Sequence, residues 1–190
     1  MSTLTEPPPG LLFLSLMFRG ETEPVDSPEK QSAVQHLVDA YGPVCYESPI
    51  FPFNYTRYYE KEMGSCIWRR LFAFQKLVPR DQLADIKLHC IKLEKHYLDE
   101  HGNRKVNLDP GLLTTENLLL ATGKNFSHRI YLQKGIFAEI TLYYHHQRFT
   151  RLPWTYPDYG SEEFCTIFSD LRKHLLEMLH AEKGQGSGDP

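Results

Sequence analysis

The chain has 190 residues, of which 41% are hydrophobic and 24% charged, as in an ordinary globular domain that folds without disulfides or metals. Its 21 lysines and arginines stand against 24 aspartates and glutamates, which gives a formal net charge of −3. This near balance excludes the strongly basic character of proteins that bind nucleic acid or anionic membranes.

The N-terminal third predicts a buried strand followed by a helix. Residues 11–18 are almost entirely apolar, too few to cross a membrane, and no basic residue precedes them as in a signal peptide. We therefore expect a buried strand there. Ser27 and Pro28 are typical of a helix start, and Gly42 with Pro43 of a helix end, so a helix is expected between them.

The middle of the chain continues this alternation. Strands are expected within 44–53, at 71–78 and at 105–108, and apolar residues three and four apart indicate a second helix over 79–98. The resulting order, β-α-β-β-α-β, is that of ferredoxin-like α+β domains.

A hairpin is expected next, and its register can be derived from the distribution of polar residues. A three-residue loop at 133–135, with its glycine left-handed, places Ile130 beside Ala138 and Arg129 beside Glu139. A two-residue turn would instead mix polar and apolar side chains on each face. We therefore expect the three-residue loop.

The last element is a helix after Ser161, with two glutamates in its first turn. The sequence thus predicts one α+β domain over 11–182, with the hairpin and this helix added to the ferredoxin-like order. A flexible arm at 1–10 and a disordered tail at 183–190 are expected to flank it.

Candidate site residues lie along one predicted strand and on the predicted hairpin. Alternation sends Lys105, Asn107 and Asp109 to one face of their strand, and Arg129, Tyr131 and Glu139 to one face of the hairpin. Lysine and arginine would neutralise a phosphate, and a carboxylate would accept a proton or hold a metal. The alternative for Asp109 is that it caps a turn at Pro110-Gly111.

Asp109 and Glu139 are also the candidate ligands for a divalent cation, Mg²⁺ or Mn²⁺. With His128 they are the candidate catalytic residues. The alternative for Glu139 is a simple cross-strand ion pair with Arg129.

Aromatic side chains gather in two loops, at 51–64 and 152–159. Tyr55 and Trp154 would close over a bound ligand, with Asp158 beside them. The alternative is that these rings cover the core, and that Asp158 interacts with a helix N-terminus.

Thr122-Gly123-Lys124 resembles the end of a phosphate-binding loop. Leu118 and Asn125 depart from that motif, and the run 118–121 is too apolar for such a loop.

Four longer stretches together carry a family resemblance. They are Phe53-Asn-Tyr-Thr-Arg-Tyr-Tyr-Glu-Lys-Glu-Met-Gly64, Lys105-Val-Asn-Leu-Asp-Pro-Gly111, His128-Arg-Ile-Tyr-Leu-Gln-Lys-Gly-Ile-Phe-Ala-Glu139 and Pro153-Trp-Thr-Tyr-Pro-Asp-Tyr159. The sequence resembles a prokaryotic family defined as a domain of unknown function, DUF4416, over nearly the whole chain. The resemblance implies a small stand-alone bacterial or archaeal protein and assigns no activity.

Two functions of different classes follow from these residues. The first is binding of a small anionic ligand, a nucleotide or other phosphoester, on the polar sheet face. The alternative is a non-enzymatic protein whose aromatic loops dock a protein partner. The four scattered cysteines form no CxxC pair, so we expect reduced thiols and a cytoplasmic protein. From the charge balance and the absence of a long apolar run, we expect binding to neither a membrane nor nucleic acid.

Overall fold

Strand β1 (Gly10–Arg19) lies in the middle of the molecule and is buried along nine of its ten residues. The computed structural model describes residues 3–20, 28–56 and 58–185. β1 pairs with neighbours on both sides and is packed on both faces, so alternating polarity is not needed. This confirms the strand expected at 11–18 and explains its continuous apolar sequence.

The described residues form nine strands and four α-helices. The other strands are β2 (Val44–Glu47), β3 (Phe51–Pro52), β4 (Ile67–Val78), β5 (Val106–Leu113), β6 (Asn117–Thr122), β7 (Ile130–Gln133), β8 (Ile136–His145) and β9 (Arg148–Arg151). The helices are α1 (Pro28–Tyr41), α2 (Glu60–Met63), α3 (Leu83–Glu94) and α4 (Glu162–Gln185), with short 3₁₀ turns at Arg80–Gln82 and Lys95–Tyr97.

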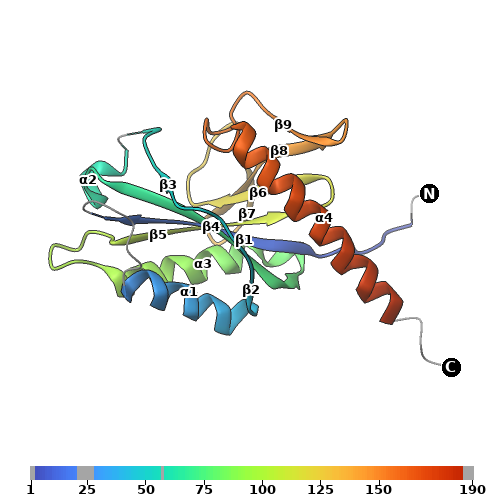
Figure 1. The fold of residues 1–190 in the computed structure, drawn as a ribbon, viewed down its shortest axis with the longest axis horizontal. Helices are drawn as coiled ribbons and strands as arrows, with labels where there is room; N and C mark the ends of the chain where they lie inside the picture. Colours follow the sequence, from blue (N-terminus) through green and yellow to red (C-terminus); the bar gives the residue numbers. More distant parts are fainter. Residues whose placement is uncertain (1–2, 21–27, 57, 186–190) are drawn as a thin grey trace.

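The strands make one sheet in the order β2-β4-β1-β5-β6-β8-β7, with β3 beside β4 and β9 beside β8. All the strand pairs in the described ranges are antiparallel. α1 and α3 cover one face of this sheet and α4 crosses the other (Figure 1). The molecule is therefore a mixed α and β domain with a three-layer arrangement.

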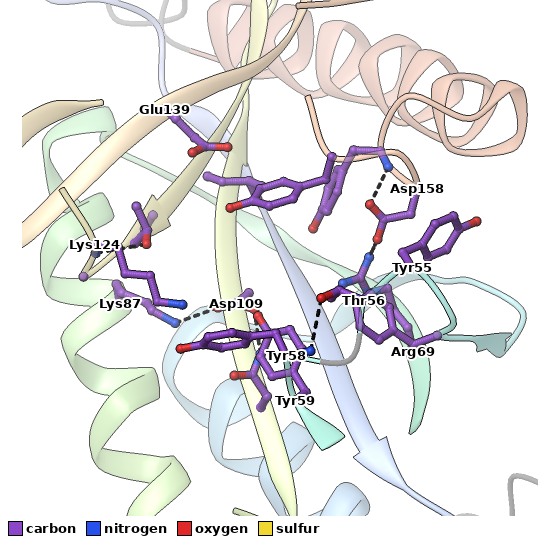
Figure 2. Close-up of a pocket in the computed structure, with 18 of the residues that line it drawn as sticks. Tyr55, Thr56, Tyr58, Tyr59, Arg69, Lys87, Asp109, Lys124, Glu139 and Asp158 are labelled. Carbon is purple, nitrogen blue, oxygen red and sulfur yellow. Dashed lines mark hydrogen bonds and ion pairs between the residues drawn. The ribbon is translucent and has the colours of Figure 1, made fainter. Parts of the chain in front are cut away.

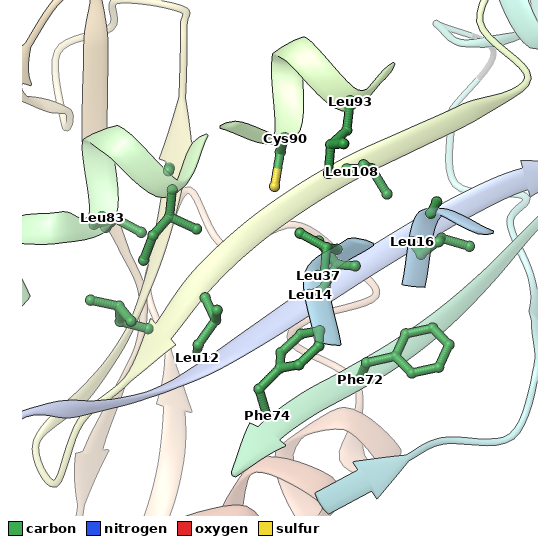
Figure 3. Packing of buried hydrophobic residues seen from close by; sticks show 14 of the residues in the cluster. Leu12, Leu14, Leu16, Leu37, Phe72, Phe74, Leu83, Cys90, Leu93 and Leu108 are labelled. Carbon is green, nitrogen blue, oxygen red and sulfur yellow. The ribbon is translucent and has the colours of Figure 1, made fainter. Parts of the chain in front are cut away.

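The sheet has an apolar core on each face. On the α1 and α3 side, alternate β1 residues such as Leu12, Leu14 and Leu16 pack against Leu37 of α1 and Cys90 of α3 (Figure 3). Under α4, the intervening β1 residues pack instead, in a second cluster. Its members from β1 and α4 are Leu11, Phe13, Phe164, Phe168, Leu171 and Leu175.

β5 is longer than the sequence predicted, because Pro110 and Gly111 lie inside the strand and form no turn. Gly111 is required there, since a side chain at this position would overlap the Phe13 ring and the Leu119 carbonyl oxygen. The expected turn at Pro110-Gly111 is therefore wrong, and with it the alternative that Asp109 caps that turn. A tight connection after Leu113 then leads into β6, a strand that the sequence did not predict.

The hairpin β7–β8 has the predicted pairing of Ile130 with Ala138 but a different loop. Lys134 and Gly135 both have positive φ, 50° and 80°, and form a two-residue turn. A register shift at Leu132 then restores the pairing that the sequence favoured. The three-residue loop is wrong. The expected pairing is confirmed, but the expected sorting into a polar and an apolar face is not, because Ile130 and Leu132 are exposed and Glu139 is buried.

The helix boundaries agree with the sequence where the structure describes them. α1 ends at Tyr41, and Gly42, with φ of 84°, donates its N–H to the Val38 carbonyl. The expected N-cap Ser27 lies outside the described residues, as does most of the expected tail, while α4 itself continues to Gln185. No helix in the described ranges is long and apolar enough to cross a membrane.

Candidate functional site

The sheet opens between β5 and β6, and this opening creates the candidate site. The two strands pair only between Gly111 and Leu113 of β5 and the facing β6 residues. Nearer the start of β5, helix α3 replaces β6 as the partner of the backbone. Glu94 accepts the Leu108 N–H at 2.7 Å, and Lys87 Nζ donates to the Leu108 carbonyl at 2.9 Å.

A pocket of about 620 Å³ lies over this opening, on the same face as α4. Its floor is formed by β4, β5 and α3, and its walls by the aromatic segment 53–59, the end of β6 and the segment 156–159 (Figure 2). The volume falls in the range of pockets that hold cofactors and other small molecules.

Along β4 and β5 the side chains change from apolar under α4 to polar at the pocket floor, which α4 does not cover. On β4 the apolar Leu71 is followed toward the pocket by Arg69, and on β5 Gly111 is followed by Asp109 and then Asn107. These residues are neighbours across the sheet, because β1 residues 15 and 17 pair with both strands. The strand order therefore brings an arginine, an aspartate and an asparagine to one place.

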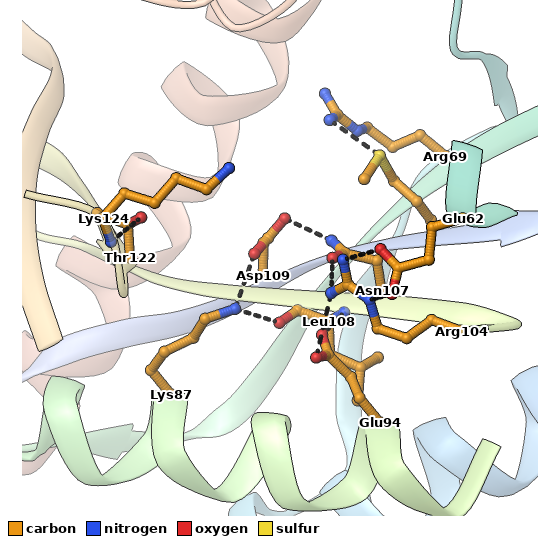
Figure 4. A network of polar contacts seen from close by, with 11 residues as sticks. Glu62, Arg69, Lys87, Glu94, Arg104, Asn107, Leu108, Asp109, Thr122 and Lys124 are labelled. Carbon is orange, nitrogen blue, oxygen red and sulfur yellow. Dashed lines mark hydrogen bonds and ion pairs between the residues drawn. The ribbon is translucent and has the colours of Figure 1, made fainter. Parts of the chain in front are cut away.

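Asp109 is held by two partners and points into the pocket (Figure 4). Its Oδ1 accepts from Lys87 Nζ at 2.8 Å, and its Oδ2 accepts from Asn107 Nδ2 at 2.6 Å. Asn107 in turn accepts from Arg104 at 2.7 Å. Each acceptor in this chain of contacts is therefore matched by a donor, as buried polar groups require.

The Lys87–Asp109 pair shifts both ionisations toward the charged forms. Burial alone would lower the pKa of Lys87, but the carboxylates of Asp109 and Glu94 raise it above its usual value. Burial alone would raise the pKa of Asp109, but the Lys87 ammonium and the Asn107 amide lower it. Both groups are therefore charged at neutral pH.

Arg104 closes the network on the side away from the pocket centre. Its guanidinium makes a two-point contact with Glu62 of α2, with both N···O distances 2.7 Å, and reaches Glu94 at 3.3 Å. The hydrogen bond from Arg104 lowers the pKa of Glu62. Burial has the opposite effect on Glu94 and raises its pKa.

A second buried ion pair joins Arg69 of β4 to Asp158 in the segment before α4. The Arg69 guanidinium lies 4.5 Å from the centre of the Phe53 ring and 5.5 Å from that of Tyr159. The Asp158 carboxylate pairs with Arg69 and does not interact with the N-terminus of α4, which was the alternative considered for it. Arg69 and Asp158 instead attach the segment before α4 to the sheet.

Glu139 lies on β8 at the opposite wall and is 2% exposed. It accepts from Arg129 Nε at 2.7 Å and lies 3.3 Å from His128 Nε2. The His128 ring stacks on Trp154 with 4.9 Å between centres. The Arg129–Glu139 pair predicted from register is therefore present and buried, so it is not the weak exposed pair of the alternative.

The pocket mouth is bridged by Tyr58 and Lys124. Lys124 Nζ lies 3.8 Å from the centre of the Tyr58 ring, a cation–π contact between the aromatic segment and the end of β6. Both side chains are exposed. Thr122, Gly123 and Lys124 all line the pocket, although they do not form a phosphate-binding loop.

Three further phenols line the walls. Burial raises the pKa of Tyr59 and of Tyr156 above the usual tyrosine value, and raises that of Tyr159 to about 12. All three stay protonated at neutral pH and can donate hydrogen bonds. With Tyr58 and Phe53 they give the pocket a strongly aromatic wall.

The structure brings about half of the sequence-predicted site residues to the pocket. Asn107, Asp109, Glu139, Tyr55 and Asp158 line it.

The other predicted site residues lie elsewhere. Arg129 and His128 lie behind Glu139 and contact it, and Trp154 contacts His128. Lys105 and Tyr131 do not line the pocket, and Tyr131 is 58% exposed beside Phe137.

Sequence reasoning missed the pocket cations Lys87, Arg69, Arg104 and Lys124. One indication was available for Lys87. It lies on the same helical stripe as Leu83, Cys90 and Glu94, so two charged residues interrupt the buried face of α3. A charged residue in such a stripe needs a buried partner, which here is the open edge of β5.

The described part of the chain contains no cluster of three or more His, Cys, Asp or Glu side chains placed to hold a metal. Asp109 and Glu139 line one pocket, but each is already bonded to a cationic side chain. Their present partners therefore provide the charge compensation that a shared Mg²⁺ or Mn²⁺ would give.

Comparisons with known proteins identify a family only. The model for "Domain of unknown function (DUF4416)" matches residues 9–175, which includes every residue of the pocket. No curated protein and no solved structure is similar enough to the chain to match it.

Proposed function

The chain belongs to the DUF4416 family, and from its site geometry we propose that it binds a small anionic ligand in the pocket between β5 and β6. The ligand class is a nucleotide or another phosphoester. The observation that carries this proposal is the convergence of two ammonium groups, those of Lys87 and Lys124, with protonated phenols on one pocket of about 620 Å³.

The two ammonium groups point into the pocket from the same side, one from α3 and one from the end of β6 (Figures 2 and 4). Lys87 is fixed by Asp109 and supplies a permanent positive charge at the floor. Lys124 is exposed and can move toward a ligand. Ammonium groups and phenol O–H donors are groups that bind phosphate oxygens.

Asp109 and Glu139 have a different role in this proposal. Each carboxylate positions a neighbouring donor, Lys87 or Arg129, and leaves the pocket without a large excess of positive charge. We retain Asp109, Glu139 and His128 as candidate catalytic residues and a divalent cation as a candidate cofactor, to be tested together with the ligand.

A second candidate function, docking of a protein partner, rests on a different surface. Four large apolar side chains are exposed at the end of the sheet, on β7 and just before it: Phe126, Ile130, Tyr131 and Leu132. Exposed apolar side chains gathered on one strand at the end of a sheet, rather than scattered singly, favour an interaction site. The aromatic loops at 51–64 and 152–159, which the sequence suggested for docking, also expose large side chains, among them Tyr55, Tyr58 and Tyr156.

We also propose a ferredoxin-like classification for the first six elements and a cytoplasmic location. The neighbour order β2-β4-β1-β5, with α1 and α3 on one face, supports the first. The second is supported by the free thiols of all four cysteines.

The proposal is tested by a thermal-shift screen of nucleotides, sugar phosphates, inorganic phosphate, Mg²⁺ and Mn²⁺. A ligand at a hundredfold excess over its Kd stabilises the fold by about 2.7 kcal/mol, which is readily measured as a rise in Tm. The rise should shrink in Lys124→Ala and persist in Lys173→Ala, whose lysine is exposed on α4. Equal responses in both variants, or none in the parent, would refute the proposal.

A further inference from the structure

The rim pair Tyr58–Lys124 differs from every other charged contact of the pocket. Lys87, Arg69 and Arg104 each pair with a carboxylate, whereas no ion pair of Lys124 occurs among the residues that the structure describes. Its ammonium lies instead against the Tyr58 ring. A cation on an exposed ring is held weakly, so this contact is the easiest in the pocket to exchange.

The backbone of Lys124 is fixed although its side chain is exposed. Its carbonyl accepts from Arg129 at 3.0 Å, and its N–H donates to Thr122 Oγ1 at 3.2 Å. Only rotation of the side chain is therefore needed to move the ammonium from the ring to a ligand. No loop has to be rearranged.

The Tyr58 ring is likewise supported from behind. It meets the Tyr59 ring edge to face at 5.1 Å, and Tyr59 packs on Phe53 at 5.7 Å. Phe53 belongs to a buried cluster with Met17 and Met63 under the aromatic segment. The ring is thus held at the pocket mouth, and the face that Lys124 now covers would be free once the ammonium moves.

We infer that Tyr58 and Lys124 together select a ligand in which an anionic group is joined to an aromatic ring, the class to which nucleotides belong. The ammonium binds the anion, and the ligand's ring replaces the ammonium on the Tyr58 face. The inference rests on the proposed function, because it divides phosphoesters into those that carry an aromatic ring and those that do not.

Both exchanges favour the bound state. An ammonium gains more from a charge-assisted hydrogen bond to a phosphate oxygen than from an exposed ring. A planar base stacks on a tyrosine face whatever its identity. A phosphoester without an aromatic ring would gain only the first of these contacts and would leave the Tyr58 face exposed.

The test compares three probes by calorimetry: nucleoside monophosphates (AMP, GMP, CMP and UMP), ribose 5-phosphate and the neutral nucleosides. The parent should bind at least one monophosphate about tenfold or more tighter than ribose 5-phosphate. Lys124→Ala should weaken the monophosphate and ribose 5-phosphate, each by about tenfold, and should not weaken the nucleoside, whose base no longer has to displace the ammonium from the Tyr58 ring.

Tyr58 variants separate the ring from the hydroxyl. Tyr58→Ala should weaken the monophosphate about tenfold and leave ribose 5-phosphate unchanged, whereas Tyr58→Phe should bind both as the parent does. Tyr131→Ala is the matched control, because Tyr131 is as exposed, at 58% against 61%, but lies outside the pocket. Both changed positions are exposed, so the variants should fold.

Two results would overturn the inference in different ways. If ribose 5-phosphate binds as tightly as every monophosphate, or if Tyr58→Ala leaves monophosphate binding intact, the ring has no role and the proposed function stands. If none of the phosphate probes binds, while the variants remain folded, the inference and the proposed function fail together.

Discussion

Both faces of β1 are apolar near the start of the strand, but they differ in polarity toward its end. On the α1 and α3 face, apolar side chains continue from Leu12 to Phe18 without interruption. On the α4 face Ser15 interrupts them after Phe13, Met17 packs in a separate small cluster, and polar floor residues lie on the neighbouring strands. α4 covers the apolar end, and the segment 53–63 covers the polar end incompletely, which leaves the pocket.

This difference shows where a site can form at little cost to folding. The two large apolar clusters stabilise the fold, so the remaining part of the α4 face can carry charges, provided that each finds a partner. At the pocket floor, Lys87–Asp109 and Arg69–Asp158 meet that condition. Changes on the two faces should therefore differ in size and in kind.

The largest effect is expected on the continuous face. Leu14 is 1% exposed, and Leu14→Asp would bury a charge among leucines with no partner. The cost should approach the entire stability of a domain this size, about 5–15 kcal/mol. Soluble yield and the cooperativity of thermal unfolding by circular dichroism measure it. A soluble variant that melts cooperatively would contradict the burial of β1.

The next largest effect is expected at the pocket floor. Lys87→Met removes the partner of Asp109 and a donor to the Leu108 carbonyl, and should cost about 3–5 kcal/mol in urea unfolding. Lys92→Met is the matched control, because Lys92 is an exposed lysine in the last turn of the same helix. If both variants lose the same small amount, the floor network does not contribute to stability.

A smaller loss is expected at the pocket wall. Glu139→Gln weakens charge-assisted contacts with Arg129 and His128 and should cost about 1.5–3 kcal/mol. The control is Glu47→Gln in the more exposed Arg70–Glu47 pair, where the loss should stay below about 1 kcal/mol. Equal losses would indicate that burial does not distinguish the two pairs.

The pH dependence of stability should reveal Asp109 directly. Its pKa is lower in the folded protein than in the unfolded chain, so its contribution is present above the unfolded value of about 3.9 and is lost as the pH falls through the folded value. The difference in unfolding free energy between the parent and Asp109→Asn should therefore shrink in acid. A constant difference between pH 7 and pH 2 would exclude this role.

The smallest effect on stability is expected at the rim. Tyr58→Ala removes an exposed ring and one cation–π contact, so the unfolding free energy should fall by no more than about 1 kcal/mol. Differential scanning calorimetry measures this change. A loss as large as that of Lys87→Met would mean that the rim supports the fold, contrary to its exposure.

Much of the fold follows from the sequence, because its regular elements have strong local patterns. The strand at 11–18 and the helices ending near Tyr41 and beginning near Glu162 lie where those patterns predict. The sequence predicts too short a strand at β5, because Pro110-Gly111 is a common turn sequence. Only long-range contacts, those with the Phe13 ring and the Leu119 carbonyl oxygen, make a glycine in that strand necessary.

The candidate site was predictable only in part. Alternation along strands brings Asp109 and Glu139 to one side, and both line the pocket. Lys87 and Arg69 come from elements whose contacts depend on how the layers pack, which a strand pattern does not contain. The distance between Tyr58 and Lys124 depends on two loops, whose relative positions have no local pattern at all.

The hydrogen bond from the Leu108 amide to Glu94 makes one backbone proton a reporter for the whole opening. Most strand amides are protected from exchange with solvent deuterium by a neighbouring strand, but this one is protected by a side chain of α3. Its exchange should therefore accelerate whenever α3 moves away from β5, even while the sheet stays intact. Deuterium uptake at Leu108 would therefore follow the separation of α3 from β5 in the native protein.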